Sequence, residues 1–264
     1  MNVACAVQSM SENYRRWFPD LTIIGHEDNI PRHIDLLILT GGGADISPDR
    51  YGDLPRGSSG VDLERDAREF NIVKTAMEMN TGVKFLGVCR GLQLLNVFFG
   101  GNLIQDMSSA GLSHGGVHPI QHRCENPFSW LTVVNSMHHQ AIRSLGENAS
   151  YATLMAMEPI TSLAEIVAWQ ERAIGVQFHP EMFSDDIGNR FFSLIAEWVG
   201  GSLAVSAKDK ESSTRYYPAG ARITIPAFGE RRIGLAYPDI VHLEIQEEDQ
   251  EEDQEDGPTG TGLG

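Results

Sequence analysis

The sequence predicts an α/β fold: an open, mostly parallel sheet that carries helices on both faces. Two observations support this prediction. Short apolar runs of strand length alternate along the 264 residues with segments whose apolar residues recur at helical spacing. These runs are largely apolar, which is typical of parallel strands buried on both faces. Strands that alternate with helices in this way imply a parallel sheet covered on both sides.

The first half of the chain supplies three strands and two helices of this plan. Residues 1–7 predict a first buried strand, and residues 34–39 predict a second that stops at three consecutive glycines. Residues 61–80 carry apolar side chains at spacings of three and four, which predicts an amphipathic helix. Residues 83–88 form the next short apolar run, and a helical pattern over residues 92–99 follows at once.

The second half continues the plan and then changes character. Strands are expected at residues 131–136, 164–169 and 172–178, and a closing helix at residues 185–199. We therefore expect a catalytic domain over 1–199 and a small extension with strand-like segments over 200–243. Residues 244–264 begin with nine carboxylates and end rich in glycine and threonine, so we expect a disordered acidic tail.

Charge, cysteine content and the length of the apolar runs indicate which kinds of protein this chain is not. The formal net charge of −16 argues against nucleic-acid binding, although the nine carboxylates of the tail leave only −7 for the rest. Three cysteines cannot all pair, and no signal peptide precedes the first apolar run, which favours a reducing, cytoplasmic setting. No apolar run approaches the ~20 residues that would span a bilayer, so no membrane segment is expected.

The segment "FLGVCRGLQLLN", residues 85–96, holds the most informative cysteine. Cys89 stands in a G-x-C-x-G pattern where a strand gives way to a helix, the cysteine counterpart of a nucleophile elbow. A thiol at a helix N-terminus is favoured as the thiolate, which is the nucleophilic form. A lone cysteine more often packs as a small apolar residue, which is the interpretation for Cys5 and Cys124. The position of Cys89 favours a nucleophile instead.

A nucleophilic thiol needs a base and a group that orients the base. His179 and Glu181 in "GVQFHPEMF" are two residues apart, so on an extended segment both side chains would point to one side. They follow an apolar strand and are expected at the carboxyl edge of the sheet, where ligands bind in open α/β folds. The backbone N–H of Arg90 and the glycine loop 41–43 are candidate donors to an oxyanion. The loop lacks the lysine of a nucleotide-binding P-loop.

Five segments of the chain can be compared with known families. They are "LTGGGADISPDRYG", "DLERDAREF", "GVCRGLQLLNVFFGGNLIQDM", "VNSMHHQAI" and "GVQFHPE". Together they resemble the class I glutamine amidotransferase superfamily, and in particular its gamma-glutamyl hydrolase-like branch, over about residues 1–199. This resemblance implies a flavodoxin-like sheet and a Cys-His-Glu triad of Cys89, His179 and Glu181, which forms a gamma-glutamyl thioester.

The resemblance also implies roles around the triad. Gly42 matches the oxyanion glycine, with Gly43 as the alternative register, and Gln93 matches a glutamine that helps to hold the gamma-glutamyl group. His139, with its neighbour His138, matches a pocket-edge motif. For these two histidines, a strand-end turn with solvated rings is an equally good interpretation.

The predicted function is hydrolysis of a gamma-glutamyl amide or isopeptide, with a small-molecule substrate. The alternative is a glutaminase component that delivers ammonia to a separate synthetase or ligase partner. A binding module with a decayed site is disfavoured because every triad position is filled. An α/β-hydrolase would place the acid before the histidine. No cofactor is expected. The spacing of His114, His118 and His122 could suggest a metal site, but glycines and a proline break the helix it would need, so none is predicted.

Overall fold

The computed structural model describes the greater part of the chain. The described residues are 1–26, 29–79, 82–112, 116–146, 152–204, 222–225 and 229–232. Most of the extension predicted at 200–243 and the acidic tail predicted at 244–264 lie outside these ranges. The division of the chain into three parts stays a prediction.

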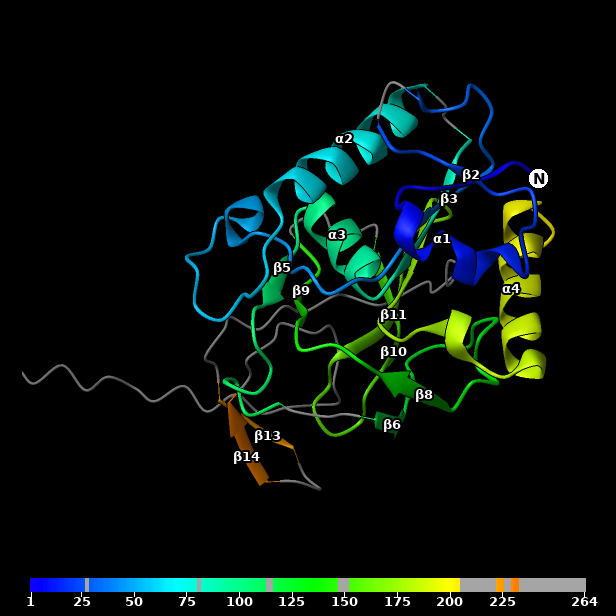
Figure 1. Ribbon diagram of the computed structural model, residues 1–264. Helices are drawn as coiled ribbons and strands as arrows, with labels where there is room; N and C mark the ends of the chain where they lie inside the picture. Colours follow the sequence, from blue (N-terminus) through cyan, green and yellow to red (C-terminus); the bar gives the residue numbers. More distant parts are fainter. Residues whose placement is uncertain are drawn as a thin grey trace, which may run out of the picture.

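An eight-stranded sheet forms the centre of the fold (Figure 1). Its strands, in spatial order, are β2 (Thr22–Ile23), β1 (Val3–Cys5), β3 (Leu36–Leu39), β4 (Lys84–Val88), β12 (Ala173–Val176), β11 (Ala164–Trp169), β10 (Ala152–Met157) and β7 (Gln121–His122). The first five strands are mutually parallel, and the last three join by antiparallel pairing. The predicted α/β class with a mostly parallel sheet is confirmed.

Helices cover both faces of the sheet, as the alternation predicted. α2 (Leu63–Met79) and α3 (Arg90–Phe98) contribute to one apolar core, and α1 (Gln8–Arg15) and α4 (Asp185–Val199) to the other. Figure 1 shows α2 and α3 on one side and α4 on the other. Strand β3 shows why two cores form: Leu37 and Leu39 join the first, and Leu36 and Ile38 the second. Successive side chains of a strand point to opposite faces, so an all-apolar strand needs cover on both.

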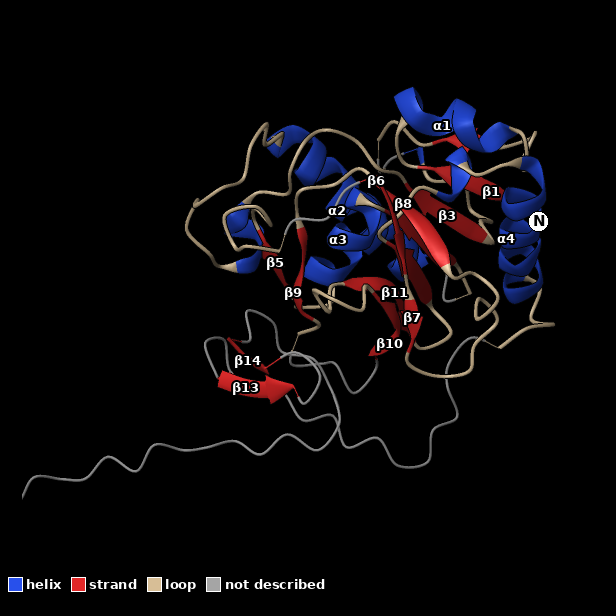
Figure 2. Cartoon of the chain, turned by 90° about the horizontal axis from the view of Figure 1, so that it is seen from below, coloured by secondary structure: helices blue, strands red, loops and turns tan. Residues whose placement is uncertain are grey.

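Small two-stranded ladders flank the main sheet (Figure 2). β5 (Asn102–Ile104) pairs with β9 (Ala141–Ser144), β6 (Gly116–Pro119) with β8 (Val133–Ser136), and β13 (Arg222–Ile225) with β14 (Gly229–Arg232). The predicted strand at 131–136 therefore exists as β8, but its expected place in the main sheet was wrong. Val133 is half-exposed, and a strand with one solvated side does not fit the doubly covered centre.

Short 3-10 helices complete the described structure. They are η2 (Pro48–Tyr51), after the glycine loop, and η4 (Pro180–Met182), after β12. α4 ends at Val199, where the sequence predicted the end of the catalytic domain. Among the residues that the structure describes, no helix is both long and apolar enough to cross a membrane.

Candidate active site

Three neighbouring parallel strands bring the predicted site residues together. Leu39 of β3 pairs with Gly87 of β4, and Val88 of β4 pairs with Val176 of β12. The chain leaves all three strands at the same edge of the sheet, because parallel strands end on one side. The segments that follow carry the glycine loop, Cys89 and His179. The predicted position at the carboxyl edge is confirmed.

Cys89 occupies the single residue between β4 and α3. Its backbone angles are φ 52° and ψ −106°, a positive φ that L-residues other than glycine rarely adopt. The N–H of Cys89 donates to the carbonyl of Val176 at 2.8 Å, which ties the strained turn to β12. Such strain persists only where surrounding structure enforces it, and it is common at active sites. The sharp strand-to-helix turn that the sequence predicted is present.

The two glycines of G-x-C-x-G are required by crowding around this turn. A Cβ on Gly87 would lie 2.5 Å from the carbonyl oxygen of Gly91. A Cβ on Gly91 would collide with the carbonyl oxygen of Leu39. Both obstacles are backbone atoms of packed elements, which cannot move aside as a flexible side chain could. The prediction that the glycines permit close backbone approach agrees with this geometry.

His179 and Glu181 form a buried pair. Nδ1 of His179 lies 2.8 Å from Oε1 of Glu181, and both residues are less than a tenth exposed. The sequence argument for this contact was wrong in one respect, because Glu181 lies in the 3-10 turn η4 and not on an extended segment. His179 is the residue just before this turn, with φ −107° and ψ 88°, and its ring still reaches Glu181 from there.

The surroundings of His179 favour the protonated ring. Burial alone lowers the pKa, but hydrogen bonds with Cys89 and Glu181 and their negative charges outweigh it and raise the pKa from 6.5 to about 10. Tyr14 of α1 is also buried beside this pair. Burial, followed by the charge of Glu181, raises the pKa of Tyr14 well above its ordinary value of 10, so its hydroxyl stays protonated.

Asn135 on β8 fixes the backbone of His179, a role that the sequence analysis missed. Its side-chain oxygen accepts from the N–H of His179 at 2.8 Å, and its amide donates to the carbonyl of His179 at 2.9 Å. The residue lies inside the segment "VNSMHHQ", which drew attention to the histidines instead. Only the placement of β8 next to η4 shows that the asparagine is the residue that touches the catalytic segment.

The glycine loop lies directly against the Cys–His pair, and the three glycines differ in their surroundings. A Cβ on Gly41 would lie 2.7 Å from Cε1 of His179 and 3.4 Å from Cβ of Cys89. Gly42 has φ 145°, and a Cβ there would collide with the guanidinium of Arg65. A Cβ on Gly43 would meet no atom within 4 Å. Gly41, which was not singled out from the sequence, is therefore the glycine that packs on the pair.

The remaining predicted site residues lie around this centre with different environments. Gln93 is buried, and its Nε2 donates to the carbonyl of Gln140 at 3.1 Å and to Oε1 of Gln177 at 3.3 Å. The side chain of His139 is 44% exposed, and its Nε2 lies 2.8 Å from Oδ1 of the buried Asp45. The ring of His139 is therefore partly solvated and held by a carboxylate, and its role at a pocket edge stays a prediction.

Histidines of the 114–122 segment find protein partners where they are described. Nε2 of His122 lies 2.7 Å from the carbonyl of Leu131, and Nε2 of His118 lies 3.5 Å from the buried carboxylate of Glu165. His114 lies outside the described residues. Within the described ranges, no group of three or more histidine, cysteine or acidic side chains could hold a metal ion.

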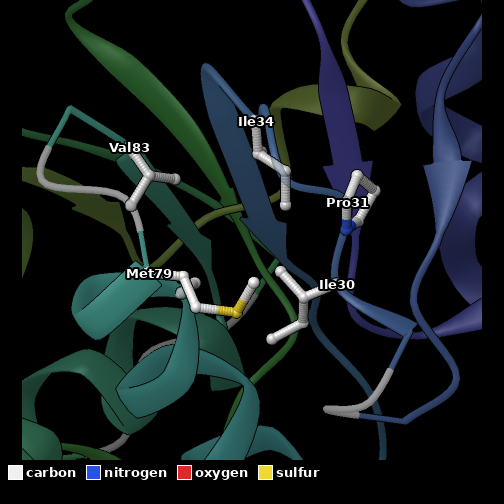
Figure 3. A pocket seen from close by; sticks show the side chains of 6 residues that line it. Ile30, Pro31, Ile34, Met79 and Val83 are labelled. Atoms are coloured by element: carbon white, nitrogen blue, oxygen red, sulfur yellow. The ribbon is translucent and has the colours of Figure 1, made fainter.

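A separate apolar pocket lies at the opposite edge of the sheet (Figure 3). Its lining consists of Ile30, Pro31, Ile34, Ala76, Met79 and Val83. Ile34 lies two residues before β3, and Val83 immediately precedes β4. The pocket is therefore at the amino ends of the strands that carry the site at their carboxyl ends. Its six lining side chains include no titratable or nucleophilic group.

Comparison with known proteins places the chain in a family. The sequence model of Peptidase C26 matches residues 23–181. "Putative glutamine amidotransferase-like protein YvdE" of Lactococcus lactis is 39% identical over 162 residues, which cover 56% of this chain and 66% of that protein. "Putative glutamine amidotransferase PB2B2.05" of Schizosaccharomyces pombe is 33% identical over 176 residues, which cover 60% of this chain and 66% of that protein. The chain thus spans just under two thirds of the length of these relatives.

Solved structures share the fold. A structure described as a putative GMP synthase component from Thermoplasma acidophilum superposes with a TM-score of 0.55 at 18% identity, covering 76% of this chain and 94% of that one. A glutamine amidotransferase from Thermotoga maritima superposes with a TM-score of 0.50 at 15% identity, covering 76% and 86%. With the family match over most of the catalytic region, the chain belongs to the Peptidase C26 family, within the class I glutamine amidotransferase-like superfamily.

Proposed function

We propose that this protein is a cysteine hydrolase that cleaves a gamma-glutamyl amide bond through a gamma-glutamyl thioester on Cys89. One observation carries the proposal: a strained cysteine at a strand-to-helix turn lies beside a histidine that a buried glutamate orients. A nucleophile, a base and an orienting acid in this order are the parts that acyl transfer requires. Family membership supports hydrolase or amidotransferase chemistry at this site.

The geometry supports a two-step reaction. The raised pKa of His179 keeps its ring protonated beside Cys89, whose sulfur reacts as the thiolate in the proposed scheme. The sulfur attacks the γ-carbonyl carbon, and the N–H groups of Arg90 and of the glycine loop stabilise the oxyanion. As the C–N bond breaks, His179 gives its proton to the departing amine. His179 then takes a proton from water, the hydroxide attacks the thioester, the C–S bond breaks, and glutamate leaves.

Glu181 and Gln93 act differently in this scheme. Glu181 holds the His179 ring by Nδ1, which leaves Nε2 to exchange protons with the sulfur and the amine. The side-chain amide of Gln93 already donates hydrogen bonds to oxygens of Gln140 and Gln177, so Gln93 holds these two residues in place. Direct contact between its amide and the gamma-glutamyl group requires one of those bonds to exchange. Gly43 of the loop and His139, whose ring contacts Asp45 just beyond the loop, are the further proposed contacts with the substrate.

A substrate panel tests the proposal. The purified protein would be incubated with glutamine and with gamma-glutamyl derivatives of aliphatic amines, aromatic amines and amino acids, and released glutamate would be followed. We expect at least one derivative to be hydrolysed in a Cys89-dependent manner, with a trapped mass increase on Cys89 equal to one gamma-glutamyl group. A protein that hydrolyses none of these amides, with Cys89 unmodified, would contradict the assignment.

The second candidate function is a glutaminase component that passes ammonia to a separate synthetase or ligase. A specific observation favours it: similar proteins include "Anthranilate synthase component 2" of Pseudomonas putida, 28% identical over 123 residues, and the Thermoplasma structure named above. Met137 and Met182 lie close in sequence to His139 and Glu181 and are each more than half exposed. Glutamine preferred over every substituted amide would favour this candidate.

A further inference from the structure

The glycine loop is clamped from outside the triad by two arginines on different helices. Arg65 of α2 donates from Nη2 to the carbonyl of Gly41 at 2.9 Å. Arg90, the first residue of α3, donates from Nε to the carbonyl of Ala44 at 2.7 Å. The two ends of a four-residue loop are thus each tied to a guanidinium group.

Both arginines share a buried acid. Glu69 accepts from Nε of Arg65 at 2.7 Å through one oxygen and from Nη1 of Arg90 through the other. Asp66 accepts from Nη2 of Arg90 and, at 2.8 Å, from the N–H of Ser47 just beyond the loop. Two cations and two anions balance, as buried charges require. An arginine fork suits this network because each guanidinium reaches an acid and a backbone oxygen at once.

The clamp on Gly41 has a directional consequence for the loop. The carbonyl of Gly41 and the N–H of Gly42 belong to one planar, trans peptide, so they point in opposite directions. Holding that carbonyl toward α2 turns the N–H of Gly42 away from α2. The Gly41 end of the same peptide packs on the Cys89 and His179 side chains. No described residue accepts a backbone hydrogen bond from the N–H of Gly42.

Resting on the proposed function, we infer that Arg65 is a positioning residue that fixes the Gly41–Gly42 peptide as the second oxyanion donor. This choice selects Gly42 over Gly43. It also explains why residue 42 is a glycine: the guanidinium of Arg65 occupies the space that a Cβ would need. Arg65 does not touch the reacting atoms. It acts through the orientation of one peptide.

The test compares two reactions of the same sulfur. Acylation of Cys89 by p-nitrophenyl acetate passes through an oxyanion: the C–S bond forms, and p-nitrophenolate leaves. Alkylation by iodoacetamide displaces iodide directly and forms no oxyanion. For each reaction, the rate of the Cys89→Ala protein would be subtracted, which leaves the rate due to Cys89. Mass spectrometry would locate the alkylated residue. A folding defect or a less reactive sulfur would lower both rates, whereas a misplaced donor lowers acylation alone.

We expect Arg65→Met to slow acylation by about 10- to 100-fold and to leave alkylation within about twofold, because a donor displaced by about 1 Å loses most of its effect. Lys74→Met is the matched control, since it removes a cation from an exposed position of the same helix. It should change neither rate. Arg65→Lys keeps a cation opposite Glu69 but loses the forked guanidinium. If Arg65→Met folds poorly, the ratio of the acylation rate to the alkylation rate in Arg65→Lys provides the same test.

The outcomes separate the inference from the substrate assignment. Equal loss of both rates in the Arg65 variants, or no loss in either, would overturn the inference, as would a wild-type protein that alkylates but never acylates. Selective loss of acylation supports it even if the substrate panel finds no gamma-glutamyl amide. In that case only the proposed substrate would fail.

Discussion

Cys5 and Cys89 both stand at the carboxyl ends of parallel strands, both precede a helix, and both are buried, at 0% and 5% exposure. Their chemistry differs. The thiol of Cys5 donates to the carbonyl of Val7 at 3.2 Å, and burial raises the pKa of Cys5 to about 11. Cys89 has a positive φ, passes directly into α3, and lies against His179. A strand end and burial therefore do not make a nucleophile; the turn and the imidazole do.

The largest expected effect separates the two cysteines by activity. Cys89→Ala should lower kcat on an active gamma-glutamyl substrate by about 10⁴-fold or more, because the sulfur forms the covalent intermediate. Cys5→Ala should leave kcat within about twofold, since its thiol faces the core. Glutamate release measures both. If iodoacetamide at neutral pH labelled Cys5 before Cys89, Cys5 would be the more reactive thiol and the comparison would be wrong.

The imidazole side of the comparison predicts a graded loss. His179→Ala should cost nearly as much as loss of the cysteine, about 10³- to 10⁴-fold in kcat, because the ring carries the protons. Glu181→Gln should cost less, about 10- to 10³-fold, because an amide can still orient the ring. Steady-state kinetics on the same substrate gives the ranking. Equal effects would count against separate roles for base and orienting acid.

The turn itself can be tested by adding one methyl group. Gly91→Ala should destabilise the fold by about 1–3 kcal/mol, although alanine is the better helix former, because the new Cβ would collide with the carbonyl of Leu39. Gly25→Ala is the control, since a Cβ there meets no atom within 4 Å. Urea unfolding of both variants measures the difference. A Gly91→Ala protein as stable as the control would show that the elbow is not crowded.

A further expected effect is a pH dependence of stability. The pKa of His179 rises on folding from 6.5 to about 10, so its contribution is fully present below pH 6.5 and is lost as pH rises through 10. The melting temperature should therefore fall between pH 6.5 and 9, below the range where Cys5 contributes.

The control for this effect is Cys89→Ala. Because a hydrogen bond with Cys89 is among the causes of the raised pKa, that variant should show a fall in melting temperature smaller by a few degrees. Identical pH profiles for the two proteins would show that the sulfur does not hold the proton on the ring.

Local patterns predicted the parts of the site that depend on neighbours along the chain. The apolar run that ends at Val88 and the pattern that resumes at Leu92 placed Cys89 at a turn. The glycines at 87 and 91 indicated that the turn is tight. The His179–Glu181 contact was also predicted, but for a wrong local reason, because a proline at 180 begins a 3-10 turn and the segment is not extended.

Other features escaped prediction because they depend on which strands become neighbours. The run at 131–136 reads as a strand, yet nothing in it tells that β8 leaves the main sheet for β6 and so brings Asn135 to His179. The antiparallel pairing of β11 with β12 is likewise absent from the periodicity of residues 164–169, since an apolar run fits either direction.

The sequence by itself determined the α/β class, the turn that presents Cys89, and the carboxyl edge at which it stands, because strand and helix periods and glycine spacing act over a few residues. Only the tertiary structure decided which groups surround the sulfur. Arg65 reaches Gly41 across 24 residues, and Asn135 reaches His179 across 44. Such contacts depend on the register of β3, β4 and β12 and on the packing of α2 and α3, to which no local pattern is sensitive.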